Sequence, residues 1–123
     1  NAFDIENNGS KIHVEIVEVP ASNIAALRKT GDHLKNKVGN DLVVLGSVIE
    51  GRPMIIVMAT NDAVKAGIHS GNIAKEIAGN MGGGGGGSPV VAQAGGKEAK
   101  QLAMALASSE TIIRDSHQKA SGG

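Results

Sequence analysis

Apolar positions along the chain follow two different periods, and each period predicts a regular element. In Lys11–Val19 every second residue is apolar at first, which predicts a strand with one buried face. The strand stops at Pro20, and Ser22 is the expected N-cap of a helix that ends at Gly39. Apolar or small residues recur in that helix at spacings of three and four, as in an amphipathic helix. This stripe consists of Ile24, Leu27, Gly31, Leu34 and Val38.

Further along, two nearly continuous apolar runs, Asp41–Ile49 and Pro53–Ala59, predict buried strands joined as a hairpin. A second helix is expected to begin at its cap, Ser70, and a short strand over Pro89–Gln93 leads to a third helix over residues 97–107. The first two strands are expected to be parallel. The pattern predicts an α/β fold, a single domain with a mixed β-sheet of about four to five strands packed by three helices.

The same pattern divides the chain into three parts. Residues 11–112 are expected to form the globular domain. Residues 1–10 are polar and contain the turn signal Asn7-Asn8-Gly9, and we interpret them as a lead-in from a preceding segment. Residues 113–123 are predicted to be a flexible tail. The 123 residues suffice for one core, and the start at Asn1 without a methionine suggests a piece of a longer protein.

Composition and charge narrow the chemistry. Phe3 is the only aromatic residue, which excludes binding by stacking bases on aromatic rings. The absence of cysteine excludes disulfides and thiolate metal sites and fits a cytoplasmic protein, and no apolar run is long enough to predict a membrane span. The net charge is 0, but residues 28–37 carry four cations against one carboxylate. Such a patch could hold phosphates, although a solvated helix face is the simpler interpretation of any single lysine.

The most unusual stretch is a run of six glycines, Gly82–Gly87, followed by Ser88-Pro89 and later by Gly95-Gly96. A flexible linker is one interpretation, but a linker would not lead directly into a strand and a helix. A Walker A loop needs Lys and Ser or Thr after the last glycine, and a dinucleotide fingerprint needs a strand before it and a helix after it. Neither condition is met. The run therefore indicates a bare backbone surface that a ligand or another chain can approach closely.

No catalytic or metal-binding constellation is apparent. The four histidines are scattered without an i, i+4 pair, and Ser70 beside His69 is better interpreted as a helix cap than as a nucleophile. The remaining polar groups are backbone amides, in the glycine run and at the helix expected to start at Gly95-Gly96-Lys97. A helix N-terminus with a lysine favours an anion such as a phosphate. The sequence therefore predicts binding without chemistry.

The segment GGGGGGSPVVAQAGG resembles the glycine-rich segment of the DHH-associated C-terminal domain, in which glycines lead through a proline into Ala-Gln and a second glycine pair. The upstream order is similar to that of the C-terminal globular domain of alanyl-tRNA synthetases, with LRKTGDHLKNKVG, VVLGSVIEGRPMIIV and AGIHSGNIAKEIA in sequence. The resemblance covers residues 11–112. In the family a basic residue often precedes the proline and an acid follows it, whereas this chain has Ser88 and Val90 at those positions.

The resemblance implies a noncatalytic domain that contacts the outer corner of the alanine-specific tRNA and helps position it for aminoacylation and editing. It implies no cofactor here. ATP and zinc would belong to the parent alanine–tRNA ligase, whose upstream domains are expected partners and whose missing upstream segment could mediate a homodimer. Two alternatives stay open: the nucleic-acid-holding domain of a DHH-type phosphoesterase, and a structural or oligomerisation module. The nucleic-acid-binding residues expected are Gly82, Gly83, Gly84, Gly85, Gly86, Gly87, Ser88, Gln93, Gly95, Gly96, Lys97, Arg28, Lys35 and Lys75.

Overall fold

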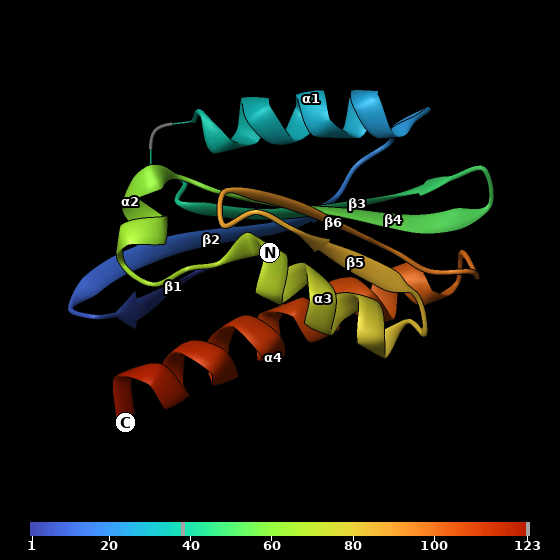
Figure 1. Ribbon diagram of the computed structural model, residues 1–123. Helices are drawn as coiled ribbons and strands as arrows, with labels where there is room; N and C mark the ends of the chain where they lie inside the picture. The colour runs from blue at the N-terminus through green and yellow to red at the C-terminus, as the bar shows by residue number, and fades with distance from the viewer. Residues whose placement is uncertain (38, 123) are drawn as a thin grey trace.

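The computed structural model describes residues 1–37 and 39–122, with side chains as far as residue 115, and shows a mixed six-stranded sheet between helices (Figure 1). The strands lie side by side in the order β1-β2-β3-β4-β6-β5. Among the described residues no helix is long and apolar enough to cross a membrane. The strands are β1 (Ala2–Asn7), β2 (Ser10–Glu18), β3 (Leu42–Ile49), β4 (Arg52–Ala59), β5 (Gly84–Gly87) and β6 (Val91–Gly95), and the helices are α1 (Ile24–Lys35), α2 (Asn61–Lys65), α3 (Ser70–Asn80) and α4 (Gln101–Gly122).

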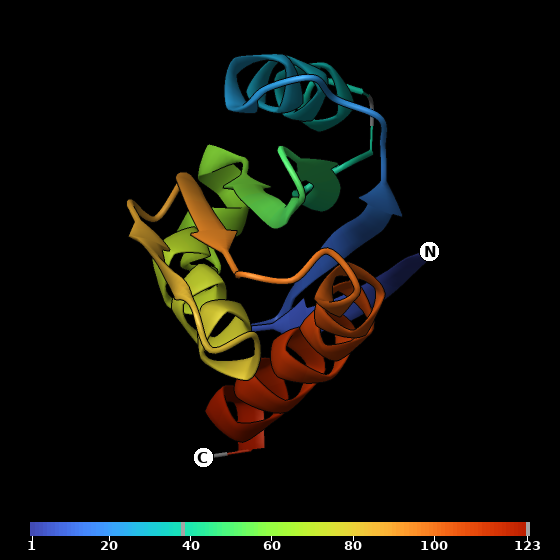
Figure 2. The same cartoon turned by 90° about the vertical axis from the view of Figure 1, so that its right-hand side faces the viewer.

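The helices cover the two faces of the sheet unequally. Helix α1 packs alone on one face, over β3 and β4, whereas α3 and α4 lie on the opposite face (Figure 1). Beneath α1 lies a small apolar cluster of Leu27, Val43, Leu45, Ile56 and Met58. The larger cluster, which includes Ile55, Val57, Ile77 and Leu102, fills the space between the sheet and the other two helices. Because α1 spans only the middle of the sheet, no helix of the described chain covers β6 and β5 on the face where α1 packs (Figure 2).

The predicted α/β class and the mixed sheet are confirmed. Strands β2 and β3 are parallel and joined through α1, and β3 pairs antiparallel with β4 as a hairpin. The hairpin turn places Glu50 at φ 52° and Gly51 at φ 76°, the two left-handed residues of a type I′ turn. The sheet has six strands instead of the four to five expected, and the described chain has four helices instead of three.

The N-terminal stretch is the first correction. Residues 1–10 were interpreted as a lead-in, but Ala2–Asn7 forms an edge strand that pairs antiparallel with β2. The turn signal marks a hairpin, with Asn8 at φ 53° and Gly9 at φ 79°. Phe3 and Ile5 face the core, and the Arg114 guanidinium lies 4.2 Å from the centre of the Phe3 ring. Two apolar positions were too few to show a strand period, so the sequence pattern alone did not reveal β1.

Three further elements differ from the prediction. The short helix α2 lies in a stretch expected to be a connector, and the glycines at 84–87 form a strand. The last helix begins at Gln101 and not at Lys97, and it continues past 107 as far as Gly122. Ile112 and Ile113 on that helix are buried, so residue 113 belongs to the core and not to a tail. The side chains of residues 116–123, where the rest of the tail was predicted, lie outside the described residues.

The N-cap of α1 gives a direct test of local structure. Asn23, and not the expected Ser22, caps the helix, because its Oδ1 accepts a hydrogen bond from the Ala26 backbone at 2.8 Å. We expect Asn23→Ala to lower the free energy of unfolding by about 1 kcal/mol, measured by urea denaturation. Ser22→Ala is the matched control and should change the free energy by less than about 0.5 kcal/mol. The reverse ranking would place the cap one residue earlier.

Candidate nucleic-acid interface

The last four residues of the glycine run form the edge strand β5, which pairs with β6 and, among the described residues, with no other strand. The two strands pair antiparallel, with Gly84 opposite Gly95 and Gly87 opposite Ala92. Ser88 closes the turn between them: its Oγ lies 3.1 Å from the Val91 nitrogen, and its own N–H donates to the Val91 oxygen at 2.9 Å. The hydroxyl group of Ser88 thus supports the turn, in a chain that carries no charged residue there.

Several glycines of this region are required by packing. A Cβ at Gly83 would collide with the backbone oxygen of Gly95, and a Cβ at Gly71 of α3 would collide with the oxygen of Gly87. A Cβ at Gly85 would lie 2.9 Å from the Ala74 oxygen, so this glycine faces α3. Helix α3 therefore packs against β5 backbone to backbone, which only glycine permits.

Gly84 and Gly86 behave differently, because a Cβ at either position would meet nothing within 4 Å. Both line a hollow of about 370 Å³, and Gly86 also lines a second hollow of about 190 Å³. The two hollows share Gly86 and Gln93 and lie over adjacent strands, so we treat them as one surface and name it the glycine furrow. It is lined by Arg28, Met54, Ile56, Gly84, Gly85, Gly86, Gly87, Val91, Ala92, Gln93, Ala94 and Gly95.

Helix α1 forms one side of the glycine furrow. Figure 2 shows α1 over the middle of the sheet, with β6 and β5 extending beyond it on one side and β1 and β2 on the other. Arg28 is exposed on α1 and lines the furrow beside Gly86. Lys35 follows seven residues later on the same side of the helix. In the described part of the chain neither cation forms an ion pair, so both are available to a ligand.

The remaining residues predicted to bind nucleic acid are less close together than those that line the glycine furrow. Lys75 is exposed on α3, which packs on the opposite face of the sheet, and Lys97 is exposed in the loop two residues after β6. The expected helix start at Gly95-Gly96-Lys97 is wrong, because α4 begins at Gln101. Gly95 belongs to β6, and the Gly96 N–H donates to the Pro53 oxygen at 3.1 Å. The structure therefore provides no helix N-terminus at these glycines.

Comparison with known proteins identifies the family. The family model described as "DHHA1 domain" matches residues 9–115, most of the chain. This chain belongs to the DHHA1 domain family. Alanine–tRNA ligases of Herpetosiphon aurantiacus and Acetivibrio thermocellus are 44% and 46% identical to it over 91% and 89% of the chain. The match covers only 12% of each of these two relatives.

A solved structure supports the fold of this DHHA1 domain. The C-Ala domain of Aquifex aeolicus alanyl-tRNA synthetase aligns with a TM-score of 0.70 over 92% of this chain and 96% of that domain, at 17% identity. At this identity the match shows the fold alone. Together with the ligase relatives, it confirms the resemblance to the C-terminal globular domain of alanyl-tRNA synthetases that the sequence carries.

On the other side of α1 from the glycine furrow, the surface of the DHHA1 domain carries negative charge, opposite in sign to Arg28. Asp4, Glu6 and Glu15 lie on the β1 and β2 surface that faces away from the larger core, with Lys11 and His13 among them. Arg28 lines the other flank. A phosphate backbone would be repelled by the carboxylates and attracted to the glycine furrow. Charge therefore distinguishes the two sides of α1.

Two neighbouring side chains on this acidic flank perturb the titration of Asp4. His13 Nδ1 lies 2.6 Å from Asp4 Oδ1 and Lys11 Nζ lies 3.4 Å from Oδ2. The hydrogen bond with His13 lowers the pKa of the Asp4 carboxyl, Lys11 adds to the effect, and desolvation opposes it. A pKa lower in the folded state stabilises the fold above the unfolded pKa, and this contribution is lost as pH falls below about 4.

We expect His13→Ala to raise the Asp4 pKa toward its ordinary value, because the largest cause of the lowering is removed. The titration midpoint of the Asp4 carboxyl carbon, followed by NMR, measures this shift. His33→Ala removes an exposed histidine of α1 and should leave the midpoint unchanged. An unchanged midpoint in His13→Ala would contradict the pairing.

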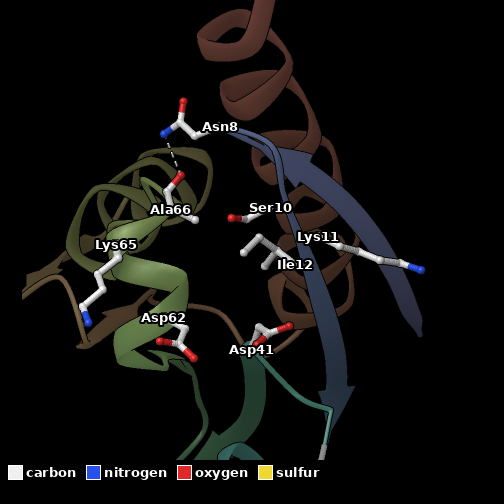
Figure 3. Close-up of a pocket in the computed structure, with 8 residues that line it drawn as sticks. All are labelled: Asn8, Ser10, Lys11, Ile12, Asp41, Asp62, Lys65 and Ala66. Carbon is white, nitrogen blue, oxygen red and sulfur yellow. Dashed lines mark hydrogen bonds between the residues drawn. The ribbon is translucent and has the colours of Figure 1, made fainter.

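A third hollow, of about 520 Å³, lies between α2 and the start of β2 (Figure 3). Asp41 and Asp62 lie at one end of it, Lys11 and Lys65 extend away, and Asn8 donates to the Ala66 oxygen at 2.9 Å. Among the described residues no group of three or more His, Cys, Asp or Glu side chains could hold a metal ion. This hollow presents carboxylates and no inward cation, so it does not suit a phosphate.

Sequence reasoning missed the apolar floor of the glycine furrow. Met54, Ile56 and Val91 were expected only as strand residues, yet they line the furrow with Gln93 and the glycines. The alternation along β6 was a usable signal: Ala92 and Ala94 are buried, which sends Val91, Gln93 and Gly95 to the other face. The uncovered state of that face depends on where α1 packs, which no local pattern shows.

Proposed function

We propose that this chain is the C-terminal domain of an alanine–tRNA ligase and that it binds tRNA through the glycine furrow and the adjacent basic side of α1. The observation that carries the proposal is the position of Arg28, which is exposed and has no ion pair among the described residues, beside a glycine strand whose open face has no side chains at Gly84 and Gly86. The similarity to alanine–tRNA ligases supplies the class of ligand. On this proposal the domain is noncatalytic and helps position tRNA for aminoacylation and editing.

The proposal extends to the parent protein. A ligase would supply the ATP and zinc sites outside this chain, which corresponds to 12% of its ligase relatives. The upstream domains would be its partners, a homodimer could form through them, and the whole enzyme would act in the cytoplasm. Binding by this domain would follow RNA shape and backbone, since the chain has one aromatic residue and Phe3 packs against the core.

The competing explanation is that the glycines serve only close packing. The geometry supports that explanation at some of the glycines and not at others. Packing accounts for Gly71, Gly83 and Gly85, whose Cβ positions are occupied by neighbouring atoms. It does not account for Gly84, which has open space above it and no left-handed φ. Gly84 leaves the backbone of this strand open to the approach of another molecule.

A filter-binding titration of the 123-residue chain with an alanine tRNA transcript tests the proposal. We expect binding at low ionic strength that weakens steeply as salt rises, because phosphates displace counterions when they pair with Arg28 and its neighbours. Bovine serum albumin at the same concentration serves as a control for nonspecific retention. Absence of salt-sensitive binding at low ionic strength would overturn the proposed function.

A further inference from the structure

Gln93 occupies the centre of the glycine furrow. It lines both hollows, whereas its neighbours Ala92 and Ala94 are buried and line one hollow each. Its side chain is exposed and makes no hydrogen bond within the described residues. A primary amide offers two donors and one acceptor side by side, which is the pattern that reads the edge of a base.

The surface around Gln93 is apolar. Met54 and Val91 are partly buried and Ile56 is fully buried, and all three pack with the cluster beneath α1. The apolar floor itself offers no contact that stabilises a phosphate group, because burying a charge against apolar atoms is unfavourable, and the group of the furrow that attracts a phosphate is Arg28. A flat group with apolar faces and a polar edge suits both the floor and the amide, and an unstacked nucleobase has that character.

Arg28 supplies the planar group that the chain otherwise lacks here. The one aromatic ring, Phe3, lies at the other end of the sheet in β1, where it contacts Arg114. A guanidinium can stack on a base plane or hold the adjoining phosphate in a bidentate contact. Arg28 and Gln93 line the same hollow of about 190 Å³, so one nucleotide can contact both.

Gly84 and Gly86 leave the glycine furrow open above β5. A Cβ at either position would project into empty space above the strand. Gly86 also has φ 154°, a conformation that side chains rarely adopt. The strand therefore presents bare backbone where a sugar and phosphate would lie if a base occupied the floor.

We propose that the glycine furrow holds one unpaired base of an RNA, with Gln93 reading the edge of that base and Arg28 contacting its face or its phosphate. This inference rests on the proposed RNA-binding function and goes beyond it, because it assigns base selection to a domain otherwise expected to recognise shape and backbone. Gln93 is then the residue that determines specificity.

Fluorescence-polarisation titrations with labelled RNA hairpins test this inference. One hairpin is fully paired, and four others carry a single bulged A, C, G or U in the same stem. We expect the 123-residue chain to bind at least one bulged hairpin about fivefold or more tightly than the paired one, with a ranking among the four bases. Gln93→Ala and Gln93→Met should lose the ranking among the four bulged hairpins.

The controls separate this inference from the proposed function. Asn72→Ala removes an exposed amide on α3, on the opposite face of the sheet, and should keep the ranking. Thermal melts by circular dichroism check that both Gln93 variants fold. Equal affinity for paired and bulged hairpins in the unaltered chain, or an intact ranking in both Gln93 variants, would overturn the role of Gln93 and leave the proposed function standing. Absence of salt-sensitive binding to every hairpin would likewise overturn the role of Gln93, whereas absence of salt-sensitive binding to the tRNA transcript would overturn the proposed function and this inference with it.

Discussion

Replacing Gly83 with alanine is expected to lower the free energy of unfolding by about 3 kcal/mol or more, the upper range for overpacking a close contact. The new Cβ would collide with the backbone oxygen of Gly95, and a backbone atom of a paired strand cannot rotate out of the way as a side chain does. Relief would require β5 to separate from β6. Urea denaturation followed by circular dichroism measures the loss.

The neighbouring residue is the matched control, with the opposite expected sign. At Gly84 a Cβ meets nothing within 4 Å, and φ does not lie in the left-handed region. Gly84→Ala should therefore leave stability unchanged or raise it by about 0.4–1 kcal/mol, because alanine restricts the unfolded chain. Equal effects of the two substitutions would mean that β5 does not pair with β6 in the register described.

Replacing Arg28 with alanine is expected to weaken tRNA binding roughly tenfold, the cost of losing one hydrogen bond to a charged group. The slope of log affinity against log salt should also become shallower by about 1, because one fewer phosphate is neutralised. Stability should change little, since Arg28 is exposed and forms no ion pair in the described part of the chain. Filter binding over a series of salt concentrations measures both quantities.

Lys65→Ala removes the same charge at a different place and serves as the control. Lys65 is exposed on α2 and extends away from the hollow beside it (Figure 3). It does not line the glycine furrow. We expect its substitution to preserve the affinity for tRNA and the salt slope. An equal loss in both variants would indicate attraction by net charge alone, without a localised interface.

The sequence by itself determined the elements that contain a long apolar stripe or a long apolar run. The stripe from Ile24 to Leu34 marked α1, and the continuous apolar runs marked the central strands β3 and β4. These predictions succeeded because burying an apolar face is the dominant local consequence of the sequence. The family resemblance also lay in the order of residues, above all in the glycine segment with Gln93, and the comparisons confirm it.

Tertiary structure decided the conformation and the surroundings of the glycine run. Local pattern could not indicate a strand at 84–87, because glycine has no side chain to show an alternation of two. Pairing with β6 and close packing by α3 create β5, and they separate Gly83 and Gly85, which packing requires, from Gly84, which faces open space. The furrow itself exists because α1 packs on β3 and β4 and stops short of β6. The local sequence thus supplies the residues of the candidate site. The shape of the site and the position of Arg28 arise only from contacts between distant segments.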